Sequence, residues 1–151
     1  MARLVWLALA LLVCACGSSH RGDRHAFLVA AESGDVAGVR AQLENGVGVD
    51  DVFNVNDPNA LYLAAINGQK EVVRVLLDAG ADPKFEYKGS SLRTEILAFR
   101  ARLKDIKADP DSSGTYRKQD GTTVDLKTLA PNDAAYDDIL EMIDKAAKSK
   151  K

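Results

Sequence analysis

The chain has 151 residues, of which 20 are Lys or Arg and 22 are Asp or Glu, so its formal net charge is −2. A charge this close to balance argues against a nucleic-acid-binding protein, which would carry a basic patch or stripe. The sequence also lacks the G-x-S-x-G, H-E-x-x-H and G-K-[ST] motifs of hydrolases, zinc proteases and phosphate-binding loops, and it identifies no cofactor. These observations favour a single non-enzymatic domain.

An apolar run over residues 4–13 follows the N-terminal Arg. This run is shorter than the roughly 20 residues that span a bilayer, and small residues follow it, so residues 1–15 are predicted to be a secretory signal. Residues 13–16, Val-Cys-Ala-Cys, are similar to a bacterial lipobox, which has an aliphatic residue three positions before the Cys. The similarity implies cleavage before Cys16, lipid on its thiol and anchoring in a membrane. An ordinary signal peptide cut after Ala15 is the alternative.

Residues 16–23 are predicted to be a lipidated tether, because the stretch after the Cys is small and polar. Asp23 at its end is a suitable N-cap for a first helix. Gly17 stands where Asp would favour retention in the inner membrane. We therefore expect a lipid-anchored protein of the bacterial cell envelope, at the outer membrane and facing the periplasm.

Two segments separated by 34 residues carry the same pattern of apolar and glycine positions. In the second segment, Asn59 is a suitable N-cap, Gly68 permits a tight turn between two helices, and Gly80 can end the second helix. Each helix pair then has one apolar face that only a neighbouring pair can bury. The matching positions are Phe27 and Leu61, Ala31 and Ala65, Gly34 and Gly68, Leu43 and Leu77, and Gly46 and Gly80.

The C-terminal half indicates two longer helices. The first begins at Ser90 or Ser91 and is amphipathic, with its apolar face formed by Leu92, Ile96, Phe99, Leu103 and Ile106. Its opposite face is basic and is interpreted as solvated rather than as a site for nucleic acid or acidic lipid. The basic residues are Arg93, Arg100, Arg102, Lys104 and Lys107. The last helix is predicted over about 133–148.

Residues 108–121, between these helices, are predicted to be a polar insertion. Asp120-Gly121 favours a two-residue turn and hence a small hairpin. Residues 109–120 also resemble an EF-hand calcium loop, but Asp at its last position and Arg117 inside it favour the hairpin and no metal site. Val124–Leu126 repeats the apolar pattern of Leu61–Leu63 at an offset of 63.

Residues 59–84 resemble one ankyrin repeat almost end to end, with Asn59–Ala65 in the place of the T-P-L-H-x-A core. The resemblance implies an all-α, ankyrin-type solenoid of stacked helix-turn-helix repeats over residues 24–148. Terminal units of such stacks are atypical because one side meets water. The expected units are clear repeats at about 24–50 and 54–86 and a degenerate third repeat over 88–148, which ends in a capping helix.

Ankyrin proteins typically bind other proteins through the tips of their turns and the exposed positions of each first helix. Large apolar groups at such places mark binding surfaces, and Phe53, Val55, Ile66 and Tyr87 are therefore expected to contribute most. Tyr62 stands where the family has His, and it is expected to contribute to the groove in which the partner binds. The partner-binding residues implied by the resemblance are Glu32, Ser33, Phe53, Val55, Asn56, Pro58, Tyr62, Ile66, Asn67, Glu86 and Tyr87.

The sequence thus predicts a membrane-anchored module that binds another protein in the bacterial envelope. Small exported ankyrin proteins resemble inhibitors, which favours an immunity or self-protection factor against an envelope-active enzyme or toxin. A passive envelope scaffold or assembly lipoprotein is one alternative. A calcium-responsive lipoprotein is the other.

Overall fold

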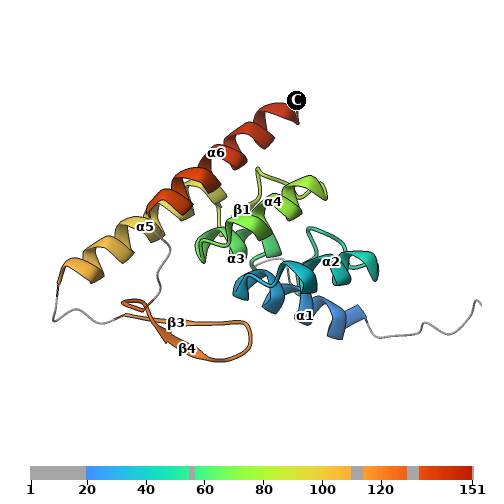
Figure 1. Ribbon diagram of the computed structural model, residues 1–151, viewed down its shortest axis with the longest axis horizontal. Coiled ribbons are helices and arrows are strands. Elements are labelled where there is room, and N and C mark those ends of the chain that lie inside the picture. Colours follow the sequence, from blue (N-terminus) through green and yellow to red (C-terminus); the bar gives the residue numbers. More distant parts are fainter. Residues whose placement is uncertain (1–19, 55–56, 110–113, 129–132, 151) are drawn as a thin grey trace, which may run out of the picture.

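A computed structural model describes residues 20–54, 57–109, 114–128 and 133–150. The helices within these residues form pairs: α1 (His20–Ser33) with α2 (Val36–Glu44), α3 (Ala60–Ile66) with α4 (Lys70–Asp78), and α5 (Leu92–Ala108) with α6 (Asp133–Ser149). The first helices contact one another in the order α1, α3, α5, and the second helices in the order α2, α4, α6 (Figure 1). The chain is therefore a stack of helix pairs, which confirms the predicted all-α solenoid.

Local chemistry fixes where the helices begin. The Asn59 side chain accepts a hydrogen bond from the Tyr62 amide at 2.9 Å, and the Ser91 hydroxyl accepts one from the Thr94 amide at 3.2 Å. Each of these bonds satisfies a donor that the first turn of a helix leaves without a partner. Both predicted N-caps are thereby confirmed. Before them, α1 begins at His20, inside the segment expected to be a tether and ahead of the N-cap expected at Asp23.

The turn between α1 and α2 requires glycine for two reasons. Gly34 has a φ of +84°, a conformation that side chains disfavour. A Cβ at this position would also lie 2.3 Å from the side-chain oxygen of Gln69. Gln69 belongs to the next turn along the stack, and its side chain donates to the Glu32 carbonyl at 3.3 Å. A Cβ at Gly34 would therefore displace the flexible Gln69 side chain and its bond to the Glu32 carbonyl.

The core runs through the whole stack as one cluster of apolar side chains. In α4, which supplies part of the apolar face expected of its helix pair, Val72, Val73 and Leu76 are buried, whereas Leu77 is only partly buried. Leu92 and Ile96 of α5 are also buried, and α6 contributes Tyr136, Ile139, Leu140 and Ile143. None of the helices in the described part of the chain has the length and apolarity that a transmembrane segment needs.

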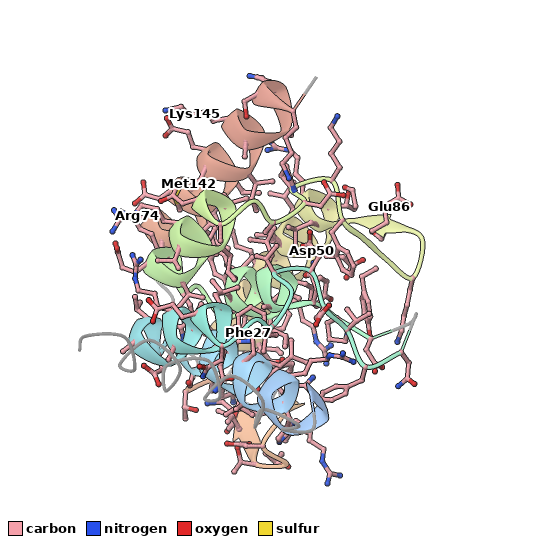
Figure 2. The ribbon with its side chains drawn as sticks, turned by 90° about the vertical axis from the view of Figure 1, so that its right-hand side faces the viewer. Phe27, Asp50, Arg74, Glu86, Met142 and Lys145 are labelled. Atoms are coloured by element: carbon pink, nitrogen blue, oxygen red, sulfur yellow. The ribbon has the colours of Figure 1, made fainter. Side chains whose placement is uncertain are left out.

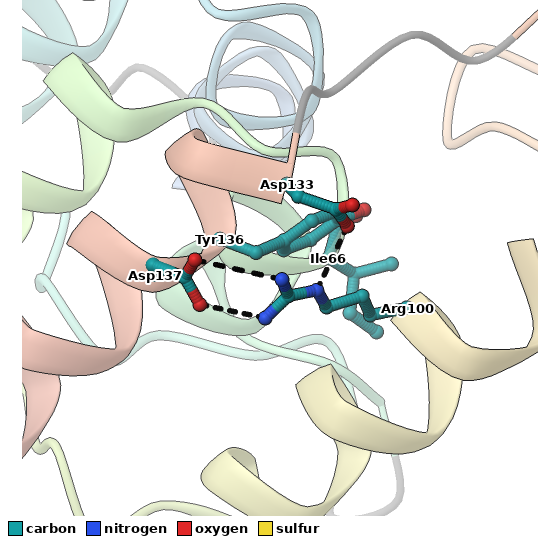
Figure 3. Close-up of polar contacts among 5 residues, drawn as sticks. All are labelled: Ile66, Arg100, Asp133, Tyr136 and Asp137. Atoms are coloured by element: carbon teal, nitrogen blue, oxygen red, sulfur yellow. Dashed lines mark hydrogen bonds and ion pairs between the residues drawn. The ribbon is translucent and has the colours of Figure 1, made fainter. Parts of the chain in front are cut away.

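Ion pairs join the two long helices of the third unit. The Arg100 guanidinium on α5 donates to Asp137 at 2.7 Å and to Asp133 at 3.0 Å on α6 (Figure 3). The hydrogen bond to Asp137, and to a smaller extent the one to Asp133, raises the pKa of Arg100. The guanidinium in turn lowers the pKa of Asp133. Arg93 makes a similar pair with Asp144 at 2.5 Å. Arg100 is thus partly buried in ion pairs and departs from the expected solvated face, whereas Arg93 pairs with Asp144 but remains exposed, as expected.

Two hairpins project from the helical stack. β1 (Glu86–Tyr87) pairs with β2 (Ser90–Ser91), and β3 (Thr115–Arg117) pairs with β4 (Thr123–Asp125), both antiparallel. The second hairpin confirms the hairpin predicted around Asp120-Gly121, where Gly121 has a φ of +85°, but residues 118–122 join its strands in place of the expected two-residue turn. Val124 and Asp125 belong to β4 and Leu126 directly follows it. The expected correspondence with the helical residues Leu61–Leu63 is therefore wrong.

Candidate protein-binding surface

Side chains of the turns between helix pairs gather on one side of the stack. The Tyr87 ring lies against the Tyr62 ring with a centroid separation of 4.7 Å, and the Lys88 ammonium lies 5.0 Å from the Tyr87 centroid. Phe53 of the preceding turn lies 6.1 Å from the His25 ring. Phe53, Pro58 and Tyr87 are partly exposed and Glu86 is exposed. We call Phe53, Pro58, Glu86 and Tyr87 the turn-tip surface.

Asp50 fixes the turns relative to one another. Its carboxylate accepts from the Asp82 amide at 3.1 Å and from the Asn59 side-chain amide at 3.3 Å. Asp50 and Glu86 lie on the same side of the stack in Figure 2. The exposed Asp50 carboxylate thus links its own turn to Asn59 and to the next turn at Asp82. Sequence reasoning missed this residue, because a single carboxylate in a polar turn belongs to no periodic pattern.

Tyr62 supports the surface from below. Its side chain is 8% exposed, and its hydroxyl donates to Glu95 of α5 at 3.3 Å. Burial raises the pKa of Tyr62, and the nearby Glu95 carboxylate raises it further, so the phenol remains a neutral donor. Tyr62 therefore holds Tyr87 in place, and the expectation that it lines an open groove is wrong.

The structure also corrects the exposure expected for three predicted contact residues. Glu32, Ile66 and Asn67 are 2%, 4% and 6% exposed. The Ile66 carbonyl accepts a hydrogen bond from the Tyr136 hydroxyl at 2.7 Å, and the Asn67 side-chain amide donates one to the Leu63 carbonyl at 2.9 Å. The third helix pair and the β3–β4 hairpin cover the C-terminal ends of α1 and α3, where these residues lie. Ser33 nearby is exposed, as predicted.

Several predictions fall on residues outside the described ones, namely Cys16, Val55, Asn56 and positions 110–113 of the possible calcium loop. At the end of that loop, the Asp120 carboxylate accepts from the side chain and the amide of Thr122 at 2.6 and 2.8 Å. Both bonds lower the pKa of Asp120, and the bond from the Thr122 side chain has the larger effect. Its carboxylate therefore closes the hairpin turn. Within the described residues, no three His, Cys, Asp or Glu side chains lie together as metal ligands would.

A shallow groove of about 390 Å³ lies between α4 and α6. Its lining includes the apolar side chains of Leu77 and Met142 and the basic side chains of Arg74 and Lys145. In Figure 2, Arg74, Met142 and Lys145 lie on the side away from Asp50 and Glu86. The groove is therefore separate from the turn-tip surface.

A model of the family described as ankyrin repeats, in three copies, matches residues 5–87. The match ends at Tyr87, before the long helices of the third unit and the hairpin between them. A search of curated proteins found no significant match.

Proposed function

Because the chain belongs to the ankyrin-repeat family, we propose that it is a lipid-anchored module of the bacterial envelope that captures and inhibits another protein. Ankyrin repeats form protein-interaction modules, and the class of partner is therefore a protein. The finer proposal is an immunity or self-protection factor, whose target is an enzyme or toxin active in the envelope.

The turn-tip surface carries this proposal. Phe53 and Tyr87 present partly exposed aromatic rings from two successive connections between helix pairs, to which Pro58 and Glu86 also belong. Aromatic side chains at the centre of an interface commonly supply a large part of its binding free energy. The Asp50 hydrogen bonds and the Tyr62 ring hold these groups before a partner arrives. A preorganised surface loses less conformational entropy on binding.

The envelope location rests on the sequence around Cys16 and is tested by its replacement. Cys16→Ser removes the thiol that would carry the lipid, so the variant should accumulate as unprocessed precursor or as a soluble exported form. Cell fractionation without detergent measures the distribution. Equal recovery of wild type and variant in the soluble periplasmic fraction contradicts lipid anchoring and leaves the ordinary signal peptide.

Capture and inhibition are tested with the chain lacking residues 1–16 as bait in an envelope extract. The bound protein is purified, and its activity is measured with and without the chain at equal concentrations. Loss of activity at that ratio supports the inhibitor. A captured protein whose activity is unchanged supports the scaffold or assembly role, and failure to capture any protein contradicts both.

A further inference from the structure

The β3–β4 hairpin reaches back across the stack to the C-terminal end of α1. The Tyr116 hydroxyl donates to one carboxylate oxygen of Glu32 at 2.6 Å, and the Gln119 amide donates to the other at 2.7 Å. The Tyr116 ring also meets the Phe99 ring of α5 edge to face, with a centroid separation of 6.3 Å, and Asn67, which directly follows α3, lies beside the Tyr116 hydroxyl. We call Glu32, Asn67 and Phe99 the Glu32 surface. The hairpin covers it in the free protein.

The charge of Glu32 is poorly matched by the hairpin. The carboxylate is buried, and its donors among the described residues are a phenol and a backbone amide, both neutral. Burial of a carboxylate costs free energy unless hydrogen bonds or an opposite charge compensate. A guanidinium would make charge-assisted, bidentate hydrogen bonds to the same two oxygens, and such bonds are stronger than neutral ones. The site is thus better suited to a cation than to its present occupant.

The hairpin can leave this site without separating any helix pair. Its strands bond to each other, and it lies between the end of α5 and the beginning of α6. Leu126 is its fully buried apolar anchor, whereas Tyr116 and Val124 are only partly buried. Thr115, Arg117, Thr123 and Asp125 alternate with these residues and are exposed. On release of the hairpin, the Glu32 carboxylate regains water, which compensates the loss of its two hydrogen bonds.

We infer that the Glu32 surface is a second protein-binding site, which the hairpin occupies until an extended partner segment brings an Arg or Lys side chain to Glu32. This inference rests on the proposed function of protein capture and adds its regulation. The hairpin and the partner segment compete for the same two carboxylate oxygens. The partner displaces the hairpin because it brings a positive charge to Glu32, whereas the two hairpin groups that bond to Glu32 are neutral.

Hydrogen exchange tests whether the hairpin opens by itself. In the full chain, the amide of Gln119, which bonds to Glu32, should exchange faster than the Leu63 amide in α3. Tyr116→Phe removes one bond to a charged acceptor and should accelerate exchange at Gln119 about tenfold or more, with Leu63 unchanged. Exchange of Gln119 and Leu63 at one common rate, in both proteins, overturns the inference because the hairpin would then open only on global unfolding.

Peptide binding tests the charge preference. The probe is a cyclic peptide of residues 114–126 in which the Tyr116 position carries Arg, and the receptor is the full chain with Tyr116→Phe. Binding should be about tenfold or more tighter than to the wild-type chain, and Glu32→Gln in the receptor should remove that gain. The peptide with its native Tyr should bind more weakly. Binding that is absent, or equal with Glu and Gln at position 32, overturns the inference.

Two controls separate this inference from the proposed function. The melting temperature of each receptor variant shows that the stack is folded. Tyr87→Ala should leave peptide binding unchanged, because Tyr87 lies on the turn-tip surface. If the peptide fails to bind while the natural partner is still captured, the Glu32 surface is not a binding site and the proposed function stands. If the peptide binds and no natural partner is captured, the proposed function fails by itself.

Discussion

Leu76→Ala is expected to lower the free energy of unfolding by about 2–5 kcal/mol. Leu76 lies on α4 in the middle of the stack, and its side chain is fully buried. The loss combines the transfer free energy of the deleted carbon atoms with the cavity that remains, because the helices packed against α4, namely α2, α3 and α6, can collapse only partly. A loss of this size is a large part of the roughly 5–15 kcal/mol that stabilises a typical domain.

Leu77→Ala is the matched control for this substitution. Leu77 follows Leu76 on the same helix but is only partly buried and lines the groove between α4 and α6. The same chemical deletion should therefore cost distinctly less free energy. Urea denaturation of both variants gives the comparison. A loss below about 1 kcal/mol for Leu76→Ala, as at an exposed position, would show that α4 does not pack as described.

The helix pairs could be predicted from the sequence because local residues determine them. Asn59 and Ser91 cap the helices they precede, and Gly34 and Gly68 permit the tight turns within pairs. The spacing from Leu92 to Ile106 gives the face of α5 that is buried. None of these features depends on residues far away in the chain, which is why a period of 34 residues was enough to place two units.

The burial of Glu32 could not be predicted in the same way. The residues that cover it, Tyr116 and Gln119, lie 84 and 87 positions further along the chain. They belong to an insertion outside the repeat pattern, and no periodicity specifies where such a segment folds back. The prediction of a solvated basic face missed the partial burial of Arg100 for a related reason, since the acids that pair with Arg100 lie on α6 beyond that insertion. Local pattern thus identified helix faces but not the long-range partners that cover them.

The double variant Phe53→Ala/Tyr87→Ala is expected to weaken capture of the partner about tenfold or more. Both rings lie on the turn-tip surface, and each Ala removes aromatic area that an interface would bury. The melting temperature should fall by only a few degrees, because neither ring belongs to the fully buried core. Titration calorimetry with the partner isolated by co-purification measures the affinity. Ile66, which the sequence also favoured, is unsuitable for this test because its burial would confound binding with stability.

The matched control replaces exposed residues on the basic face of α5. Lys104→Ser/Lys107→Ser removes two positive charges from α5 without touching the Arg93 and Arg100 ion pairs. Exposed charges outside an interface change association rates modestly and in a salt-dependent way, so affinity at physiological salt should stay nearly constant. If this variant loses the partner while Phe53→Ala/Tyr87→Ala retains it, the partner docks on the third helix pair. The turn-tip surface would then have no part in capture, because its two aromatic groups would have been removed without effect.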